Sequence, residues 1–184
     1  FYNYTKANSQ TMSILVFAES ADGKIKKTSI EAVAYAAAMH GDVTAIAMGT
    51  IDSDELQNLG KYGAKKVLHV ADARLDAAVT KAYASVLVKA LADEQAATLV
   101  LAGSSLGTPV AARVATQINA SLATNVVELP DTASGFTVKR SIYTGKAFAL
   151  VELRNDKKVI AIKKNAIDIK ENGNAVSVTP YTAS

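Results

Sequence analysis

The chain has 184 residues, of which 49% are hydrophobic and 20% charged, and its formal net charge is +3. These values fit one packed globular domain and exclude a disordered chain. The absence of cysteine excludes a disulfide framework, a thiolate zinc site, a cysteine-held iron–sulfur cluster and a cysteine nucleophile. The basic residues cluster only in pairs, which gives no indication of nucleic-acid binding.

The start of the chain is polar as far as Thr11, and Met12 opens the first apolar run. We therefore interpret residues 1–11 as a tail or an added remnant, with Met12 in the place of an initiator. No apolar run reaches the roughly 20 residues of a membrane span. The start also lacks the apolar stretch of a secretory signal. We expect a cytoplasmic protein with no membrane insertion.

Four short runs are almost entirely apolar and show no alternation with polar residues. This pattern is typical of strands that are covered by helices on both faces of a sheet, as in parallel α/β proteins. The runs are Ser13–Ala18, Val43–Met48, Val67–Val70 and Thr98–Ala102.

Helical patterns fill the gaps between these runs and follow the last one. They cover residues 28–41, 52–60, 77–92 and 108–119. Thr28 with Glu31, and Asp52 with Glu55, have the spacing of a capping box. Gly41 is expected to end the first helix. Four strand–helix cycles predict βαβ units and therefore a three-layer α/β/α fold with a mostly parallel sheet.

Two further acidic residues, Asp72 and Asp76, are expected to cap the long third helix. Its apolar stripe includes Val79, Tyr83 and Leu87.

The pattern changes after Leu122, where four strand-like runs follow one another without helices. They are Val126–Leu129, Thr137–Tyr143, Ala147–Leu153 and Val159–Ile162. Because their connections are short, we expect them to pair as an antiparallel meander added to the parallel sheet. The α/β domain then covers residues 12–162, and the polar residues 163–184 are expected to form a linker toward a further domain.

The segment Gly103–Thr108 joins the fourth strand to a helix, at the place where α/β sheets bind ligands. It has no lysine of a Walker loop and no dinucleotide fingerprint. We therefore expect a structural turn capped by Ser105 or Thr108, with phosphate binding as the alternative.

No other residues form a convincing site. His40 and His69 lack metal-ligand spacing, and Ser104 and Ser105 have no base nearby in sequence. The segment Tyr143–Lys146 is expected to be a polar hairpin tip. The residues therefore assign no catalytic, cofactor-binding or metal-binding position.

Several segments resemble electron transfer flavoprotein α subunits. They are Met12–Glu19 with Gly23–Ile25, Leu59–Val70, Leu101–Gly107 with Ala111–Ala115, and Arg140–Ala147, which is close to the family's R-x-I-Y-x-G-N-A hairpin. Thr108 stands where the family often has arginine, and Lys146 where it often has asparagine.

This resemblance implies the N-terminal domain of an electron carrier rather than an enzyme. In the family, a C-terminal domain holds most of the FAD, so we expect this segment alone to bind none. The resemblance also implies a β-subunit partner and, for the whole complex, acyl-CoA or other flavin dehydrogenases as electron donors to a respiratory or quinone-linked acceptor.

Two alternatives remain open on the sequence. One is a stand-alone nucleotide-binding domain of the universal-stress type, with ATP or AMP at Gly103–Thr108. The other is a small hydrolase, which the lack of a base–nucleophile pair disfavours.

Overall fold

A computed structural model describes residues 12–182 of the chain. Its main feature is a nine-stranded sheet in the order β11-β5-β4-β1-β6-β10-β7-β8-β9, and β2 pairs with β3 in a small separate ribbon. The strands are β1 (Ser13–Phe17), β2 (Ser20–Ala21), β3 (Lys24–Ile25), β4 (Asp42–Met48), β5 (Lys66–Val70), β6 (Thr98–Ala102), β7 (Ser121–Val126), β8 (Thr137–Ile142), β9 (Ala147–Glu152), β10 (Lys158–Ile162) and β11 (Val178–Pro180).

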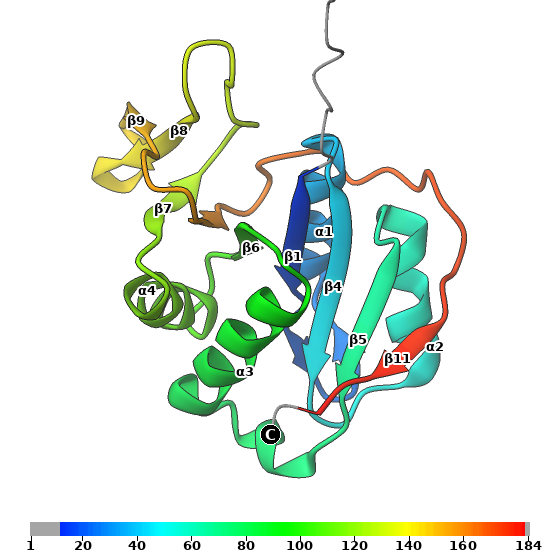
Figure 1. Cartoon of the computed structure of the whole chain (residues 1–184). Helices are drawn as coiled ribbons and strands as arrows, with labels where there is room; N and C mark the ends of the chain where they lie inside the picture. The colour runs from blue at the N-terminus through cyan, green and yellow to red at the C-terminus, as the bar shows by residue number, and fades with distance from the viewer. Residues whose placement is uncertain (1–11, 183–184) are drawn as a thin grey trace, which may run out of the picture.

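The four predicted apolar runs are the neighbouring strands β1, β4, β5 and β6, and all of their pairings are parallel. Helices cover both faces of the sheet (Figure 1). They are α1 (Lys27–Ala38), α2 (Ser53–Gln57), α3 (Thr80–Asp93) and α4 (Gly107–Gln117), with short 3-10 helices η1 (Asn58–Tyr62), η2 (Ala73–Ala77) and η3 (Tyr143–Gly145). The predicted three-layer α/β/α fold is confirmed.

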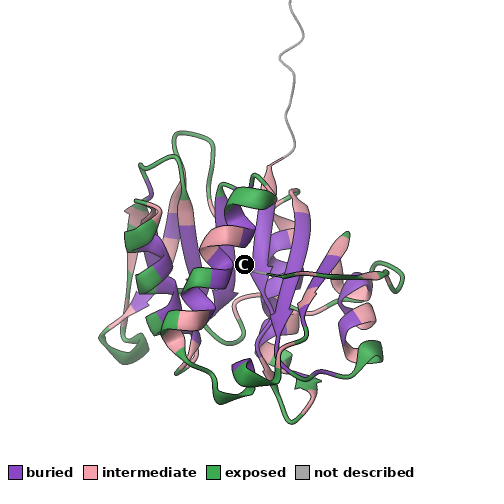
Figure 2. Ribbon diagram, turned by 60° about the horizontal axis from the view of Figure 1, so that its bottom comes forward, coloured by how far each residue is buried: buried purple, intermediate pink, exposed green. Residues whose placement is uncertain are grey.

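The continuous apolar character of the strands has a direct cause in this layering. Along β1, Ile14 and Val16 pack into the cluster formed with α1. Leu15 and Phe17 pack into the opposite cluster, formed with α3 and α4. Figure 2 shows the central strands buried along their length. Both side-chain directions of each strand are therefore removed from water, which favours apolar residues on both faces of the strand.

The capping boxes predicted for α1 and α2 do not form. Neither helix has a side-chain cap. Glu31 accepts a hydrogen bond from the N–H of Ile167 at 3.3 Å, and Glu55 accepts one from Ile25 at 3.0 Å. These carboxylates instead connect their helices to distant segments. A local spacing rule does not detect this use, because the donors lie 136 and 30 residues away in sequence.

Other expected helix signals also have different roles. Asp72 caps η2 by accepting from the N–H of Arg74, rather than capping α3. Val79 is 52% exposed at the N-cap of α3, so it does not belong to the buried stripe that contains Tyr83. At the end of α1, His40 takes the left-handed conformation expected of Gly41, with φ of 58°.

The second half of the sheet differs from the predicted meander. The hairpin of β8 and β9 is antiparallel as expected. However, β10 lies between β6 and β7 and is parallel to both. Ile160 packs on the α1 side, and Val159 on the α3–α4 side. A strand with two apolar faces needs helices on both sides, and only the interior of the sheet offers them.

The strand predicted at Val126–Leu129 lies earlier, at Ser121–Val126. Asn125 has a left-handed φ of 56°, and the pairing of β7 with β10 shifts register at this point. The resulting bulge bends the chain. The chain then pairs with β8 at the end of β7, where Val126 lies opposite Arg140 and the N–H of Val127 donates to the carbonyl of Lys139.

The segment after β10 is less separate from the domain than its polar sequence indicates. It passes along α1 and η1 and ends as β11, which pairs in parallel with β5 (Figure 1). Tyr181 then packs against the core and donates a hydrogen bond from its hydroxyl to Asp93 at 2.7 Å. The sequence predicts no strand here. Whether this segment leads to a further domain stays a prediction.

Candidate functional site

The principal cavity lies at the carboxyl ends of the parallel strands. From β1 the chain proceeds to β4 and β5 on one side, and then crosses to β6 on the other side. This reversal next to β1 is the topological switch point at which α/β sheets bind ligands. The cavity, which we call the crevice, has a volume of about 640 Å³. The charged side chains that line it are Glu19, Asp22, Lys26 and Asp76.

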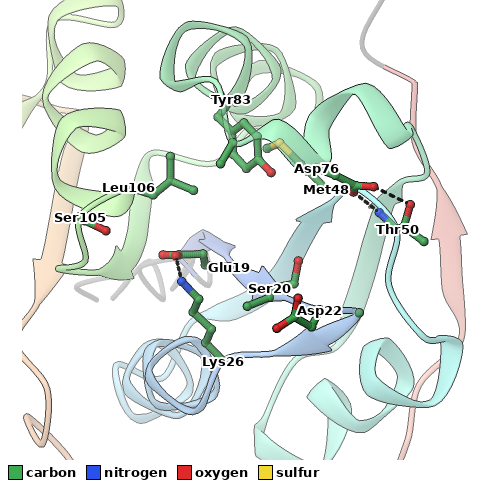
Figure 3. Close-up of a pocket in the computed structure, with 13 residues that line it drawn as sticks. Glu19, Ser20, Asp22, Lys26, Met48, Thr50, Asp76, Tyr83, Ser105 and Leu106 are labelled. Carbon is green, nitrogen blue, oxygen red and sulfur yellow. Dashed lines mark hydrogen bonds and ion pairs between the residues drawn. The ribbon is translucent and has the colours of Figure 1, made fainter.

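Glu19 occupies the floor of the crevice, directly after β1. Glu19 is only 4% exposed. One carboxylate oxygen forms an ion pair with the ammonium of Lys26, and the other accepts a hydrogen bond from the hydroxyl of Ser104 at 2.5 Å. The backbone is held as well, because the N–H of Glu19 donates to Ser29 at 2.8 Å. Figure 3 shows Glu19 and Lys26 pointing toward each other on the same side of the crevice.

Ser104 connects this carboxylate to the start of α4. Its hydroxyl oxygen accepts from the N–H of Gly107 at 2.7 Å, and its carbonyl accepts from Thr108 at 3.0 Å. Ser104 therefore caps the turn that leads into α4, a role that the sequence assigned to Ser105 or Thr108, while Leu106, directly before the helix, makes no side-chain cap. Among the described residues, the N–H groups of Ser105 and Leu106 have no hydrogen-bond partner. Both residues line the crevice.

The opposite wall of the crevice is also acidic. Asp76 accepts hydrogen bonds from the N–H and the hydroxyl of Thr50, at 2.7 and 2.9 Å. This tie between η2 and the end of β4 replaces the predicted capping of α3 by Asp76. Tyr83 donates to the carbonyl of Leu75 at 2.6 Å, and burial raises the pKa of its hydroxyl. This wall therefore offers carboxylate oxygens rather than a positive charge.

The glycines after β6 have a packing role. A Cβ atom on Gly107 would lie 2.1 Å from the carbonyl oxygen of Ala102, and one on Gly103 would lie 3.0 Å from that of Ile162. Glycine is required at position 107, where a backbone atom lies too close for any Cβ, and is favoured at position 103, where the contact is only tight. This geometry supports the structural-turn interpretation of Gly103–Thr108, and no phosphate is needed to explain either glycine.

The histidines do not meet at a site. The ring of His69 lies on β5 with Nε2 2.8 Å from the carbonyl oxygen of Gly49, whereas His40 follows α1. Between residues 12 and 182, no three His, Asp or Glu side chains are grouped so that they could hold a metal ion. None of the helices in the same range is long and apolar enough to cross a membrane.

A second candidate surface is the hairpin of β8 and β9, which lies at the end of the sheet (Figure 1). Three large apolar residues are exposed on it: Phe148 by 57%, Leu150 by 75% and Tyr143 by 76%. The tip has three successive residues with positive φ, Tyr143, Thr144 and Gly145. Such strained backbone persists where the surrounding structure holds it, often at functional sites. The tip is an exposed turn, and the ring of Tyr143 adds an aromatic group to it.

The hairpin and the segment that follows it have a large excess of positive charge. Residues 137–164 contain eight basic and two acidic side chains, a net charge of +6 in a chain whose total is +3. Pairs of basic residues looked dispersed in the sequence because they are separated by apolar strands. Lys139 lies on the hairpin, over the ring of Phe148. Lys158 and Lys163, at the two ends of β10, contact the ring of Phe136 just before β8 and the hydroxyl of Ser141 on β8.

Residues 14–183 match the model of the electron transfer flavoprotein domain. The chain belongs to this family. The electron transfer flavoprotein domain therefore accounts for nearly all of the folded segment, as the resemblance of its motifs indicated.

Curated relatives of this electron transfer flavoprotein domain are α subunits. The chain is 26% identical to electron transfer flavoprotein subunit alpha of Bacillus subtilis over 86% of its length, and 27% identical to that of Syntrophomonas wolfei over 89%. It is also 27% identical to the probable mitochondrial α subunit of Saccharomyces cerevisiae over 91% of its length. The chain covers 49%, 51% and 49% of these three proteins, so it spans about half of their length.

Proposed function

We propose that this chain is the N-terminal scaffold and subunit-interface domain of an electron transfer flavoprotein α subunit. The whole protein would be a cytoplasmic electron carrier that accepts electrons from flavin dehydrogenases, such as acyl-CoA dehydrogenases, and delivers them to a respiratory or quinone-linked acceptor. The observation that carries the proposal is the exposed apolar and basic hairpin, on a domain whose crevice is unsuited to a phosphate-bearing cofactor.

FAD fits the crevice poorly. A pyrophosphate is recognised by free N–H donors and cationic side chains. Three carboxylates, Glu19, Asp22 and Asp76, line the crevice against one ammonium, that of Lys26, and this ammonium is already paired. We therefore place the flavin in the full heterodimer and assign none of its contacts to this segment.

The hairpin has the properties of a protein-docking surface. Exposed aromatic and aliphatic side chains supply the apolar contact from which interfaces gain most of their affinity. The ladder between β8 and β9 runs from Thr137–Glu152 to Ile142–Ala147. Since β9 is the last strand of the sheet, its other edge is unpaired within the described residues. An unpaired edge accepts a strand from a partner. We assign this edge to the β subunit.

A binding experiment tests the interface. The chain is mixed with the β subunit from the same organism, and complex formation is measured by size-exclusion chromatography and calorimetry. Leu150→Asp should weaken binding about ten-fold or more, since a charge would be buried in the apolar contact. Val79→Asp is the matched control, because Val79 is similarly exposed but lies at the start of α3. Equal affinities of all three proteins would contradict the hairpin assignment.

A spectroscopic experiment tests the scaffold role. The chain is incubated with FAD, desalted and examined for flavin absorbance, and the complete α chain with its β subunit is treated in the same way. We expect a colourless chain and a yellow complex. Stoichiometric flavin retained by the isolated chain would overturn the scaffold assignment and return the crevice to consideration as a cofactor site.

A further inference from the structure

The crevice retains the geometry of a phosphate site but carries the wrong charge. It lies at the switch point, its volume of about 640 Å³ is in the range of small-molecule sites, and the N-terminus of α4 opens into it. The N–H groups of Ser105 and Leu106, which have no partner among the described residues, are the donors that bind an anion at a helix start. Lys26 supplies a cation on the same floor.

Glu19 meets the requirements of an internal anion at this place. Its carboxylate is separated from the first turn of α4 by a single hydroxyl group, because Ser104 donates to Glu19 and accepts from Gly107. The same carboxylate pairs with Lys26. A buried carboxylate needs such partners, since an unpaired charge removed from water is strongly unfavourable. One side chain of the protein itself therefore neutralises the ammonium and places a negative charge beside the helix start, where a phosphate would otherwise bind.

We propose that Glu19 is the residue that closes the switch-point crevice of this protein to phosphate-bearing ligands, by taking the place of their anionic group. The inference is independent of the proposed subunit interface, which lies on the hairpin. It makes Glu19 a specificity-determining residue: with its carboxylate present, an incoming phosphate finds Lys26 neutralised and three negative charges around it. With this carboxylate removed, Lys26 becomes available to a phosphate beside the N–H groups of Ser105 and Leu106.

The electrostatics favour Glu19 over the other carboxylates as the deciding group. Asp22 is exposed at the mouth of the crevice, where water screens its charge. Asp76 is committed to Thr50 on the far wall. Only Glu19 is almost completely buried and directly linked to both Lys26 and the cap of α4. Removing its charge therefore changes the potential at the helix start more than removing either of the others.

Calorimetric titration with AMP, and separately with inorganic phosphate, tests the proposal on the whole chain. The wild-type protein should bind neither below millimolar concentrations. Glu19→Gln, which keeps the size and a hydrogen-bonding oxygen of the side chain, should bind both at least ten-fold more tightly. Asp22→Asn makes the same change of charge at the mouth and should change affinity less than three-fold. In the double variant Glu19→Gln with Lys26→Met, the gain should be lost.

Folding of each variant is checked by circular dichroism and urea unfolding, and Glu19→Ala is used in the same titrations if the glutamine variant does not fold. Two results would overturn the proposal. One is a folded Glu19 variant whose affinity for AMP and phosphate is unchanged. The other, which needs no variant, is micromolar AMP binding by the wild-type chain, since this would show that the Glu19 carboxylate does not exclude phosphate.

Discussion

Replacement of Gly107 by alanine separates a packing glycine from a ligand-binding glycine. In a helix, this exchange normally stabilises by about 1 kcal/mol. Here, the new Cβ would lie 2.1 Å from the carbonyl oxygen of Ala102 and 3.0 Å from the hydroxyl of Ser104. The obstructing atom at 2.1 Å belongs to the backbone of β6, so it cannot move aside as a flexible side chain could. The start of α4 must therefore shift by about 1 Å.

The expected cost follows from these contacts. Overpacking of this kind costs about 3 kcal/mol, and the displaced cap at Ser104 adds about 1 kcal/mol. After the helix-propensity gain of about 1 kcal/mol is subtracted, Gly107→Ala should lower the free energy of unfolding by about 3 kcal/mol. For a chain of this length, that corresponds to a melting temperature lower by roughly 6–12 °C.

Urea unfolding followed by circular dichroism, without added ligand, measures this effect. Gly103→Ala is the graded control, because its Cβ would lie 3.0 Å from the carbonyl of Ile162, a contact that a shift of a few tenths of an ångström relieves. We expect it to cost less than about 1 kcal/mol. The packing argument is refuted if Gly107→Ala is as stable as the wild type, or if the two variants cost the same.

Two further predictions concern hydrogen bonds that tyrosine hydroxyls make to distant elements, one to a backbone carbonyl and one to the carboxylate of Asp93. Tyr35→Phe removes the hydrogen bond from the hydroxyl to the carbonyl of Glu128 at 2.7 Å, so urea unfolding should show a free energy of unfolding that is lower by about 1 kcal/mol. An unchanged free energy of unfolding would contradict the stabilising role of this hydrogen bond. Hydrogen bonds from Lys89 and Tyr181 lower the pKa of Asp93. The stabilisation is therefore present above the unfolded pKa of about 4 and lost as the pH falls through the lower folded value. Asp93→Asn should flatten this part of the pH–stability curve, and an unchanged slope would disprove the linkage.

The parallel half of the fold could be predicted because its signal is local. In β1, β4, β5 and β6, each strand is buried on both faces, so most of its residues are apolar and the run is visible without knowledge of its neighbours. The amphipathic helices between them leave right-handed parallel crossovers as the expected connection. The order of these strands within the sheet did not follow from the same pattern.

The second half was mispredicted where long-range packing overrides chain proximity. A short connection after β9 suggested that β10 would pair with it, yet β10 lies on the other side of β7. The two-faced apolar character of Val159–Ile162 was already evidence for an interior strand. The bulge at Asn125 left a weaker trace, since a left-handed asparagine within a strand is recognisable only after the strand has been placed.

In the candidate site, too, the features with a local sequence signal could be predicted and those that depend on long-range contacts could not. The sequence located the turn after β6 correctly, because glycine and serine between a strand and a helix are a local signal. It did not reveal Glu19 as part of the site, although the residue stands directly after the first strand. Its partner Ser104 is 85 residues away, and the two meet only because β1 and β6 are adjacent in the sheet. Topology, rather than composition, creates the constellation.

The net charge of +3 conceals two regions of opposite character, and the fold determines what each can do. Residues 137–164, which comprise the hairpin and β10, carry +6 near exposed apolar side chains, whereas the charged side chains that line the crevice sum to −2. Charges on an exposed surface accelerate and orient association with a partner of opposite sign, and they act together with the apolar contact. Charges inside a cavity select ligands, because the surrounding protein reduces screening. A partner that docks at the hairpin should therefore be acidic and present an apolar strand, and its association rate should fall steeply with salt.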